Sequence, residues 1–244
     1  MAKLTRVPLS GLEPGERKLE PKTAHYLCDV LRLRAGEKFI AFDPQTKCEA
    51  DARLAVSEDG TYCGIGALRE AARATDTGIV LVQALGKGDK TEQVVRAATA
   101  LGVSELHLVE SARSVSRVND RSDNKRARWE AIALDAARQC GRADVPKILG
   151  PHTLAHELAD WREQNAIKLC LVPGAAQSLR LLTADWSPGS PIAILIGPEG
   201  GLASEEISAA EQAGFVAASF GELVLRTEIA GTAVLGALLL LGQT

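Results

Sequence analysis

The chain has 244 residues, of which 46% are hydrophobic and 24% charged, and its formal net charge is −3. That length suits one large or two smaller domains with a well-buried core. No signal-peptide pattern or bilayer-spanning apolar run is present, so we expect a cytoplasmic protein without a membrane segment. The five cysteines are dispersed and form no Cys-x-x-Cys pair, which argues against a disulfide framework and a zinc site.

The first part of the chain is predicted to form a small β-rich domain. Turn signals such as Asp43-Pro44 and Asp59-Gly60 separate short segments that suit β-strands, at 38–42, 48–56 and 61–68. The stretch 69–78 lacks a sustained apolar pattern and is predicted to be a linker. We therefore expect one domain at 1–72 and a second at 73–244.

The second part is predicted to be an α/β domain with a mostly parallel sheet, because apolar strands and helical stretches alternate. The expected strands are 79–85, 106–109, 168–172, 192–196 and 215–220. The expected helices are 90–101, 124–140, 152–164, 204–213 and 229–241. His152 and His156 would share one face of a helix, but no third ligand accompanies them, so we expect a surface helix and no metal site.

Charge is segregated along the chain. Residues 1–38 carry eight basic and five acidic side chains, 113–128 carry six basic and two acidic ones, and 148–244 carry four basic and ten acidic ones. A local basic strip can bind a phosphate backbone even on an acidic protein, because close contacts are screened less than the distant field. A solvated helix face is the alternative.

The stretch from Ile192 to Leu202 reads as a buried strand that ends in a glycine-rich loop. Its β-branched residues and flanking Pro191 and Gly197 favour a strand over a helix. Glycines at 197, 200 and 201 allow close approach of a flat ligand, and Ser204 is the expected N-cap of the next helix. A strand-to-helix turn without a ligand is the alternative.

The absence of two common phosphate-binding motifs narrows the class of possible cofactors. The chain has no Gly-x-x-x-x-Gly-Lys-Ser/Thr loop and no Gly-x-Gly-x-x-Gly after its first α/β strand, which argues against nucleoside triphosphate and dinucleotide cofactors. A cofactor without phosphates remains compatible. Its expected place is the carboxyl end of the strands.

Two loops together carry a specific resemblance. Gly197-Pro198-Glu199-Gly200-Gly201 and Leu225-Arg226-Thr227-Glu228-x-Ala230 resemble the paired C-terminal motifs of the SPOUT methyltransferases, in particular the bacterial 16S ribosomal RNA uridine-N3 methyltransferases. The likeness continues upstream in chain order at Lys87-Gly88-Asp89-Lys90, Leu101-Gly102-Val103, Arg113-Ser114-Val115, Gln139-Cys140-Gly141-Arg142 and His25 to Leu33.

The resemblance implies a PUA-like β-barrel that binds RNA, followed by a SPOUT domain with a C-terminal trefoil knot around S-adenosylmethionine. It implies a homodimer that methylates N3 of a uridine in 16S rRNA, either free or in the small ribosomal subunit. The residues expected to hold the cofactor lie in three loops: Leu171, Val172, Pro173, Gly174, Ile196, Gly197, Pro198, Glu199, Gly200, Gly201, Leu223, Val224, Leu225, Arg226, Thr227 and Ala230.

Three charged residues are the expected catalytic groups. Arg226 would stabilise negative charge that develops on the base or grip the target phosphate. Glu199 and Glu228 could each accept a proton through water. The alternatives are that Glu228 stabilises a helix N-terminus, Glu199 orders its loop, and Arg226 pairs with one of them.

The expected RNA contacts are basic residues in both domains, which would position the RNA through its backbone: Arg32, Arg34, Lys87, Arg113, Arg117, Lys125, Arg128 and Arg142. His25 could stack on RNA or pack in the domain core. Ala100 departs from the family pattern, which has a glutamate there. A non-catalytic ribosome-assembly factor and a metabolic α/β enzyme with another small cofactor are the competing classes; the first has no need of the intact loop pair, and the second predicts no RNA affinity.

Overall fold

The computed structural model describes residues 4–71, 77–115 and 122–241. The chain divides into two compact units, described here separately. One comprises residues up to 74 together with 137–144, and the other comprises 75–136 and 145–244. Within the described ranges, no helix is long and apolar enough to cross a membrane.

The first unit is built on a six-stranded sheet in the order β1-β3-β4-β5-β2, with β6 also paired to β4. All pairs are antiparallel except β1 with β3. Its strands are β1 (Arg6–Pro8), β2 (Gly15–Lys18), β3 (Lys38–Asp43), β4 (Cys48–Ser57), β5 (Gly60–Ile65) and β6 (Arg69–Glu70). Alternate residues of β4, such as Ala52 and Leu54, are buried against Phe39 and Leu27 in one apolar core, as a half-buried sheet requires. The expected β-rich character is confirmed.

A short helical segment interrupts these strands. The helix α1 (Pro21–His25) begins with proline, which suits the first helical turn, and runs into a π-helical turn at Tyr26–Val30. Leu27 is its fully buried residue, and Ala24 and Cys28 are partly buried beside it, so this segment packs on the core through one face. The sequence pattern had predicted neither this helix nor β1, β2 and β6.

The second unit has a seven-stranded sheet in the order β11-β13-β10-β12-β7-β8-β9, and every neighbouring pair is parallel. The expected parallel α/β sheet is therefore confirmed. The strands are β7 (Ile79–Ala84), β8 (Glu105–Glu110), β9 (Lys147–Thr153), β10 (Ile167–Leu171), β11 (Gln177–Ser178), β12 (Ile192–Ile196) and β13 (Val216–Ser219).

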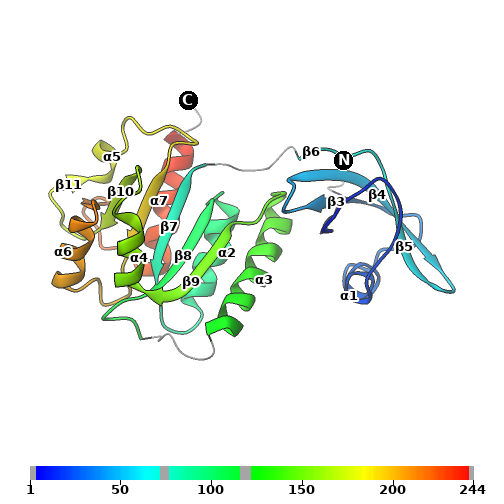
Figure 1. The fold of residues 1–244 in the computed structure, drawn as a ribbon, viewed down its shortest axis with the longest axis horizontal. Helices are drawn as coiled ribbons and strands as arrows, with labels where there is room; N and C mark the ends of the chain where they lie inside the picture. The colour runs from blue at the N-terminus through cyan, green and yellow to red at the C-terminus, as the bar shows by residue number, and fades with distance from the viewer. Residues whose placement is uncertain (1–3, 72–76, 116–121, 242–244) are drawn as a thin grey trace. The chain divides into compact units, whose positions relative to one another are not determined.

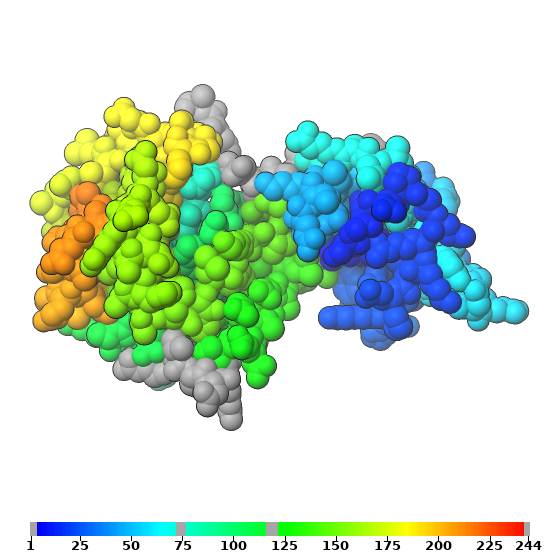
Figure 2. Space-filling model, viewed as in Figure 1, coloured from blue at the N-terminus to red at the C-terminus, as the bar shows by residue number. Residues whose placement is uncertain are grey.

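Helices cover both faces of this sheet (Figure 1). One core joins α2 (Lys90–Ala100), α3 (Ser122–Cys140) and α7 (Thr227–Leu241) to alternate strand residues such as Leu81 and Ile194. The opposite core joins α4 (Leu154–Trp161) and α6 (Ser204–Gln212) to the intervening residues such as Val82 and Leu195. Figure 2 shows α4 and α6 side by side on the surface, in yellow-green and orange. Burial on both faces explains why the central strands are continuously apolar.

Two expectations about element ends are wrong. The helix expected at 152–164 begins at Leu154, because the preceding residues form β9, so His152 lies in a strand and His156 in α4. The N-cap of α6 is Ala203 rather than Ser204, and the Glu206 carboxylate accepts the Ala203 amide at 2.9 Å. The short helix α5 (Leu179–Leu182) was not expected.

Candidate functional site

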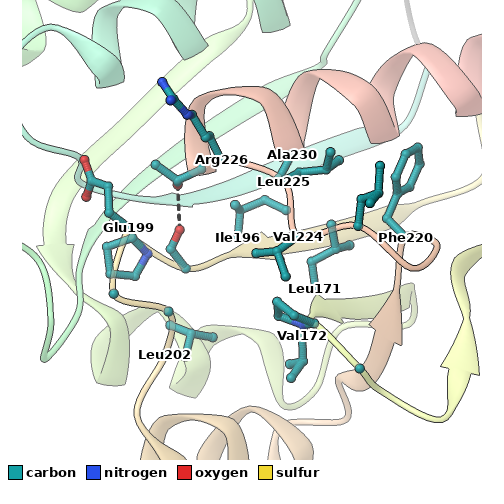
Figure 3. Close-up of a pocket in the computed structure, with 18 of the residues that line it drawn as sticks. Leu171, Val172, Ile196, Glu199, Leu202, Phe220, Val224, Leu225, Arg226 and Ala230 are labelled. Atoms are coloured by element: carbon teal, nitrogen blue, oxygen red, sulfur yellow. Dashed lines mark hydrogen bonds between the residues drawn. The ribbon is translucent and has the colours of Figure 1, made fainter.

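A pocket of about 580 Å³ lies at the carboxyl ends of β10, β12 and β13. Three loops surround it, each leaving one of these strands. Figure 3 shows Leu171, Ile196 and Leu225 gathered along its apolar part, with Glu199 at one edge. Its position follows from the fold, since ligands of open α/β sheets bind where strands end.

Every residue expected to hold a cofactor lines this pocket. The structure thus brings together three loops that are far apart in the sequence, at 171–174, 196–201 and 223–230. It adds residues that sequence reasoning had not named: Lys90, Leu202, Ile207, Ala218, Phe220, Gly221 and Glu222. Ala218 and Phe220 belong to β13 and its end, so only the strand order could have shown that they face this space.

A hydrogen-bonded clamp joins two of the loops at the floor of the pocket. The Thr227 hydroxyl donates to the Gly197 carbonyl oxygen at 2.6 Å, and the Gln83 side-chain amide donates to the Thr227 oxygen at 2.9 Å. Both side chains are buried. Thr227 therefore fixes the start of α7 against the end of β12, and Gln83 in β7 holds Thr227.

The two expected carboxylates meet at a lysine. The Lys90 ammonium lies 3.0 Å from Glu199 Oε1 and 3.5 Å from Glu228 Oε2, and the Lys87 amide donates to Glu199 Oε1 at 2.9 Å. Lys90 is the first residue of α2, whereas Glu228 is in the first turn of α7. Lys90 belongs to a motif of the family resemblance, but its pairing with the two carboxylates was not predicted from the sequence, because α2 and the two loops meet only in the fold.

Glu199 is held in its ionised form. Burial opposes ionisation, but hydrogen bonds from the amides of Lys87 and Glu199 and the Lys90 ammonium outweigh it and lower the pKa of Glu199. The hydrogen bond to Glu199 raises the pKa of Lys90 against a smaller opposing effect of burial. At neutral pH, the pair is a carboxylate and an ammonium.

Arg226 is a cation at the edge of the same pocket. Its side chain is exposed and extends away from the apolar lining (Figure 3). Among the described residues, no carboxylate pairs with Arg226 at salt-bridge distance, so the predicted alternative that it pairs with Glu199 or Glu228 is wrong: Lys90 takes that place. The guanidinium is thus available to an anionic group.

The basic loop after β8 is joined to the glycine-rich loop. Arg113 Nη1 donates to the Gly200 carbonyl oxygen at 2.8 Å, and the Ala112 amide donates to Glu206 Oε1 at 2.7 Å. A Cβ on Gly200 would lie 3.3 Å from Arg113 Cβ, so glycine allows this close packing. Arg113 therefore helps to hold one wall of the pocket, and its side chain is exposed, so its expected contact with phosphate stays a prediction.

The other expected RNA contacts differ in their exposure and in their partners. Arg32, Arg34 and Lys87 are exposed, Lys125 is half-buried, and Arg128 is paired with Glu92 at 2.8 Å. Arg142 is buried and bound through two hydrogen bonds to Asp144, which contradicts its expected surface role. Arg117 lies outside the described residues. His25 is exposed and 2.7 Å from Asp29, so the alternative that it packs in the core is wrong.

Among the described residues, no group of three or more His, Cys, Asp or Glu side chains is arranged to hold a metal ion. The cavity is lined mostly by apolar side chains and loop backbone, with one ion-pair cluster and the Arg226 guanidinium at its edge. Such a cavity suits a flat organic ligand held by backbone groups and apolar side chains.

Two protein-domain families match this chain. The RNA methyltransferase domain family matches residues 74–239, and the RNA methyltransferase PUA domain family matches residues 19–61. The first of these covers more than half of the chain and all three loops of the pocket.

Similar proteins agree with this assignment. The ribosomal RNA small subunit methyltransferase E of Bacillus subtilis is 29% identical over 88% of this chain and 86% of the relative. That of Mycobacterium bovis is 30% identical over 85% of this chain and 80% of the relative.

Solved structures resemble the whole fold. A methyltransferase E from Neisseria gonorrhoeae bound to S-adenosylmethionine superposes with a TM-score of 0.84 at 27% identity, over 98% of both chains. A Legionella pneumophila structure, described as a methyltransferase in complex with the same cofactor, gives a TM-score of 0.88 at 29% identity over 99% of both chains. With the matching domains, the aligned relatives and the pocket in one chain, the protein belongs to the ribosomal RNA small subunit methyltransferase E family.

Proposed function

We propose that this protein transfers a methyl group from S-adenosylmethionine to N3 of a uridine in 16S rRNA. The observation that carries the proposal is the convergence of three loops on one pocket, in a chain of this family. A cavity of about 580 Å³ is within the usual range for a ligand of this size. When bound, the cofactor supplies the methyl group.

Residues of the pocket suit an adenosine-containing cofactor. Leu171, Ile196 and Leu225 offer apolar surface to the faces of a flat ring, and the neighbouring loop backbones offer donors and acceptors to its edge. The sixteen residues expected from the sequence are proposed as the cofactor contacts, with Lys90, Leu202 and Phe220 added from the structure. The lining carries two cations, Lys90 and Arg226, and two carboxylates, Glu199 and Glu222, so it lacks the excess of positive charge that would favour phosphates.

The chain supplies charge and position for the reaction. Uridine N3 carries a proton at neutral pH and must lose it to become a good nucleophile. Glu199 is ionised at the pocket edge and is proposed as the acceptor of that proton, either directly or through water. Arg226 is proposed to stabilise negative charge on the base or to bind the target phosphate. Glu228 is proposed to act through Lys90.

Five further features of the family are proposed for this chain. The crossing of the chain around β10, which has β12 on one side and β13 on the other, supports a C-terminal trefoil knot. Exposed Leu223, Val224, Ile229 and Leu240 support a homodimer that covers this part of the domain. The domain division at 72/73, a cytoplasmic location and RNA binding by the exposed basic residues complete the proposal.

Mass spectrometry of rRNA from a deletion strain tests the function. The strain should lack one uridine methylation in 16S rRNA, and the wild-type gene should restore it. An Arg226→Ala gene should not restore the methylation, although the variant protein should bind S-adenosylmethionine in calorimetry. An unchanged modification profile in the deletion strain would exclude the assignment.

A further inference from the structure

Lys90 occupies an unusual place for a lysine. It is the first residue of α2, where the helix dipole disfavours a cation. Its ammonium nevertheless points toward two carboxylates from other parts of the chain, at 3.0 Å and 3.5 Å. The local cost at the helix N-terminus is offset by these long-range contacts, so helix stability does not explain the lysine.

The surrounding backbone is shaped to admit this side chain. A Cβ on Gly86 would lie 3.0 Å from Lys90 Cβ and 3.5 Å from Glu199 Oε1. The Lys87 amide reaches the same carboxylate oxygen at 2.9 Å. The turn between β7 and α2 thus presents one backbone donor and one ammonium to Glu199. Gly86 in this turn has no side chain, which leaves room for both.

We propose that Lys90 is the positioning residue of the proton-transfer step: its ammonium orients Glu199 at the pocket edge and keeps it ionised so that it accepts the N3 proton of the target uridine. In this step the N3–H bond breaks, the proton passes to the Glu199 carboxylate, and the bonding electron pair stays on N3. The inference rests on the proposed function and assigns a role that is separate from Arg226.

Several charged groups face Glu199 from the elements around it. Lys90 reaches it from α2, Glu228 lies beyond Lys90 in the first turn of α7, and Arg226 precedes that turn. Arg113 binds the carbonyl of the next residue in the same loop. Lys90 is the group in direct ion-pair contact, and Glu228 competes with Glu199 for it.

Replacement of Lys90 and replacement of Glu228 should therefore shift the pKa of Glu199 in opposite directions. Replacement of Lys90 by methionine removes the cation and should raise the pKa of Glu199. Replacement of Glu228 by glutamine leaves Lys90 to Glu199 alone and should lower it. The ratio of variant to wild-type kcat/KM, measured across pH, cancels the titration of uridine itself, because both enzymes use the same RNA.

The test measures methylation of a 16S rRNA substrate from about pH 5.5 to pH 8 by full-length enzyme. The Lys90→Met ratio should fall by about twofold as the pH decreases to its lower limit. Lys90→Arg and Glu228→Gln should each keep a flat ratio, because Glu199 stays ionised throughout this pH range in both variants. Lys147→Met, an exposed lysine of β9, is the matched control with a ratio near one. Calorimetry with S-adenosylmethionine is run on each variant, so that any change in cofactor binding is separated from the pH dependence of methylation.

The outcomes separate this inference from the proposed function. If the wild-type enzyme methylates no uridine, the proposed function fails. If it methylates uridine but the Lys90→Met ratio is flat with pH, Lys90 has only a structural role and the inference is overturned. If Lys90→Met does not fold, Lys90→Gln, which also removes the cation, decides: a flat ratio for this variant overturns the inference as well.

Discussion

Glu157 and Glu199 are both carboxylates with lowered pKa values, but their surroundings differ. Glu157 is buried between α4, β8 and β9, where it accepts from His107 Nδ1 at 2.6 Å, His152 Nε2 at 2.5 Å and Trp161 Nε1 at 2.5 Å. Glu199 lies in a loop, has a side chain that is 30% exposed, and shares Lys90 with a second carboxylate.

The difference shows that burial decides whether a charged side chain only stabilises the fold or also remains accessible to a ligand. Burial disfavours the charged form of Glu157, but the partners of both its oxygens outweigh this and lower its pKa to about 2. Such a group stabilises the fold and is closed to other molecules. Glu199 keeps access to the pocket, so its charge is available for chemistry. A low pKa alone would not distinguish the two.

The largest expected effect is on stability, from Glu157→Gln. Loss of the charge removes the buried carboxylate that His107, His152 and Trp161 share and leaves His107 with the more exposed Glu105, so we expect a decrease of about 3 kcal/mol in the free energy of unfolding. Urea denaturation measures it, with Glu163→Gln on the exposed surface as the control. Methylation by the folded fraction should remain near wild type; a large loss of turnover would mean that this cluster also serves the reaction.

The second effect is on activity, from Glu199→Gln. Removal of the proposed base should lower kcat by about 100-fold or more, while the free energy of unfolding changes by less than about 0.5 kcal/mol. Single-turnover methylation and urea denaturation measure the two quantities. Glu205→Gln, an exposed carboxylate of α6, is the control. Equal loss of stability and activity would remove the contrast with Glu157.

A decrease in pH should destabilise the folded wild-type protein through protonation of Glu157. Because its pKa of about 2 in the folded protein is below its usual value of 4.5, its contribution is complete above about pH 4.5 and is lost as the pH falls toward 2. The stability difference between wild type and Glu157→Gln should therefore shrink by about 2 kcal/mol over this range, since glutamine resembles the protonated acid. A constant difference would contradict the pKa.

The smallest effect concerns the clamp at the pocket floor. Thr227→Val leaves the Gly197 carbonyl and the Gln83 amide without their shared partner and should cost about 1 kcal/mol or somewhat more. Cofactor affinity should weaken several-fold, as calorimetry can measure. Thr232→Val, which removes a hydroxyl bonded within α7, should leave affinity unchanged. Unchanged affinity in Thr227→Val would show that the loops hold their places without the clamp.

Much of the second unit was predictable because its strands are apolar on both faces. The run 192–196 matches β12 residue for residue, and the other expected strands differ only at their ends. The strand β9 was missed because Gly150 and Pro151 interrupt it, which a central strand would not tolerate. It lies at the sheet edge, where proline is accommodated, and the histidine pattern then misleadingly suggested a helix.

The site was predictable in its loops but not in its charges. The glycines and apolar residues in 196–201 and 223–230 could be interpreted from the local sequence, because they reflect backbone freedom and the ends of strands. The partners of Glu199 could not be predicted in this way, because Lys90 and Lys87 reach it from more than 100 positions away. The same holds for Arg113 and Arg142: both look like surface cations in the sequence, but tertiary contacts direct the first to a loop carbonyl and bury the second.

The hydrogen bond between Gln83 and Thr227 joins positions 144 residues apart. Domains are generally made and folded in order during translation, so the β-rich unit can form on the ribosome long before this bond closes. The pocket cannot be completed until α7 has been synthesised and has packed against α2. A chain cut short between residues 144 and 227 would therefore keep the unit that we propose binds RNA, but it would lack the contact that completes the proposed cofactor pocket.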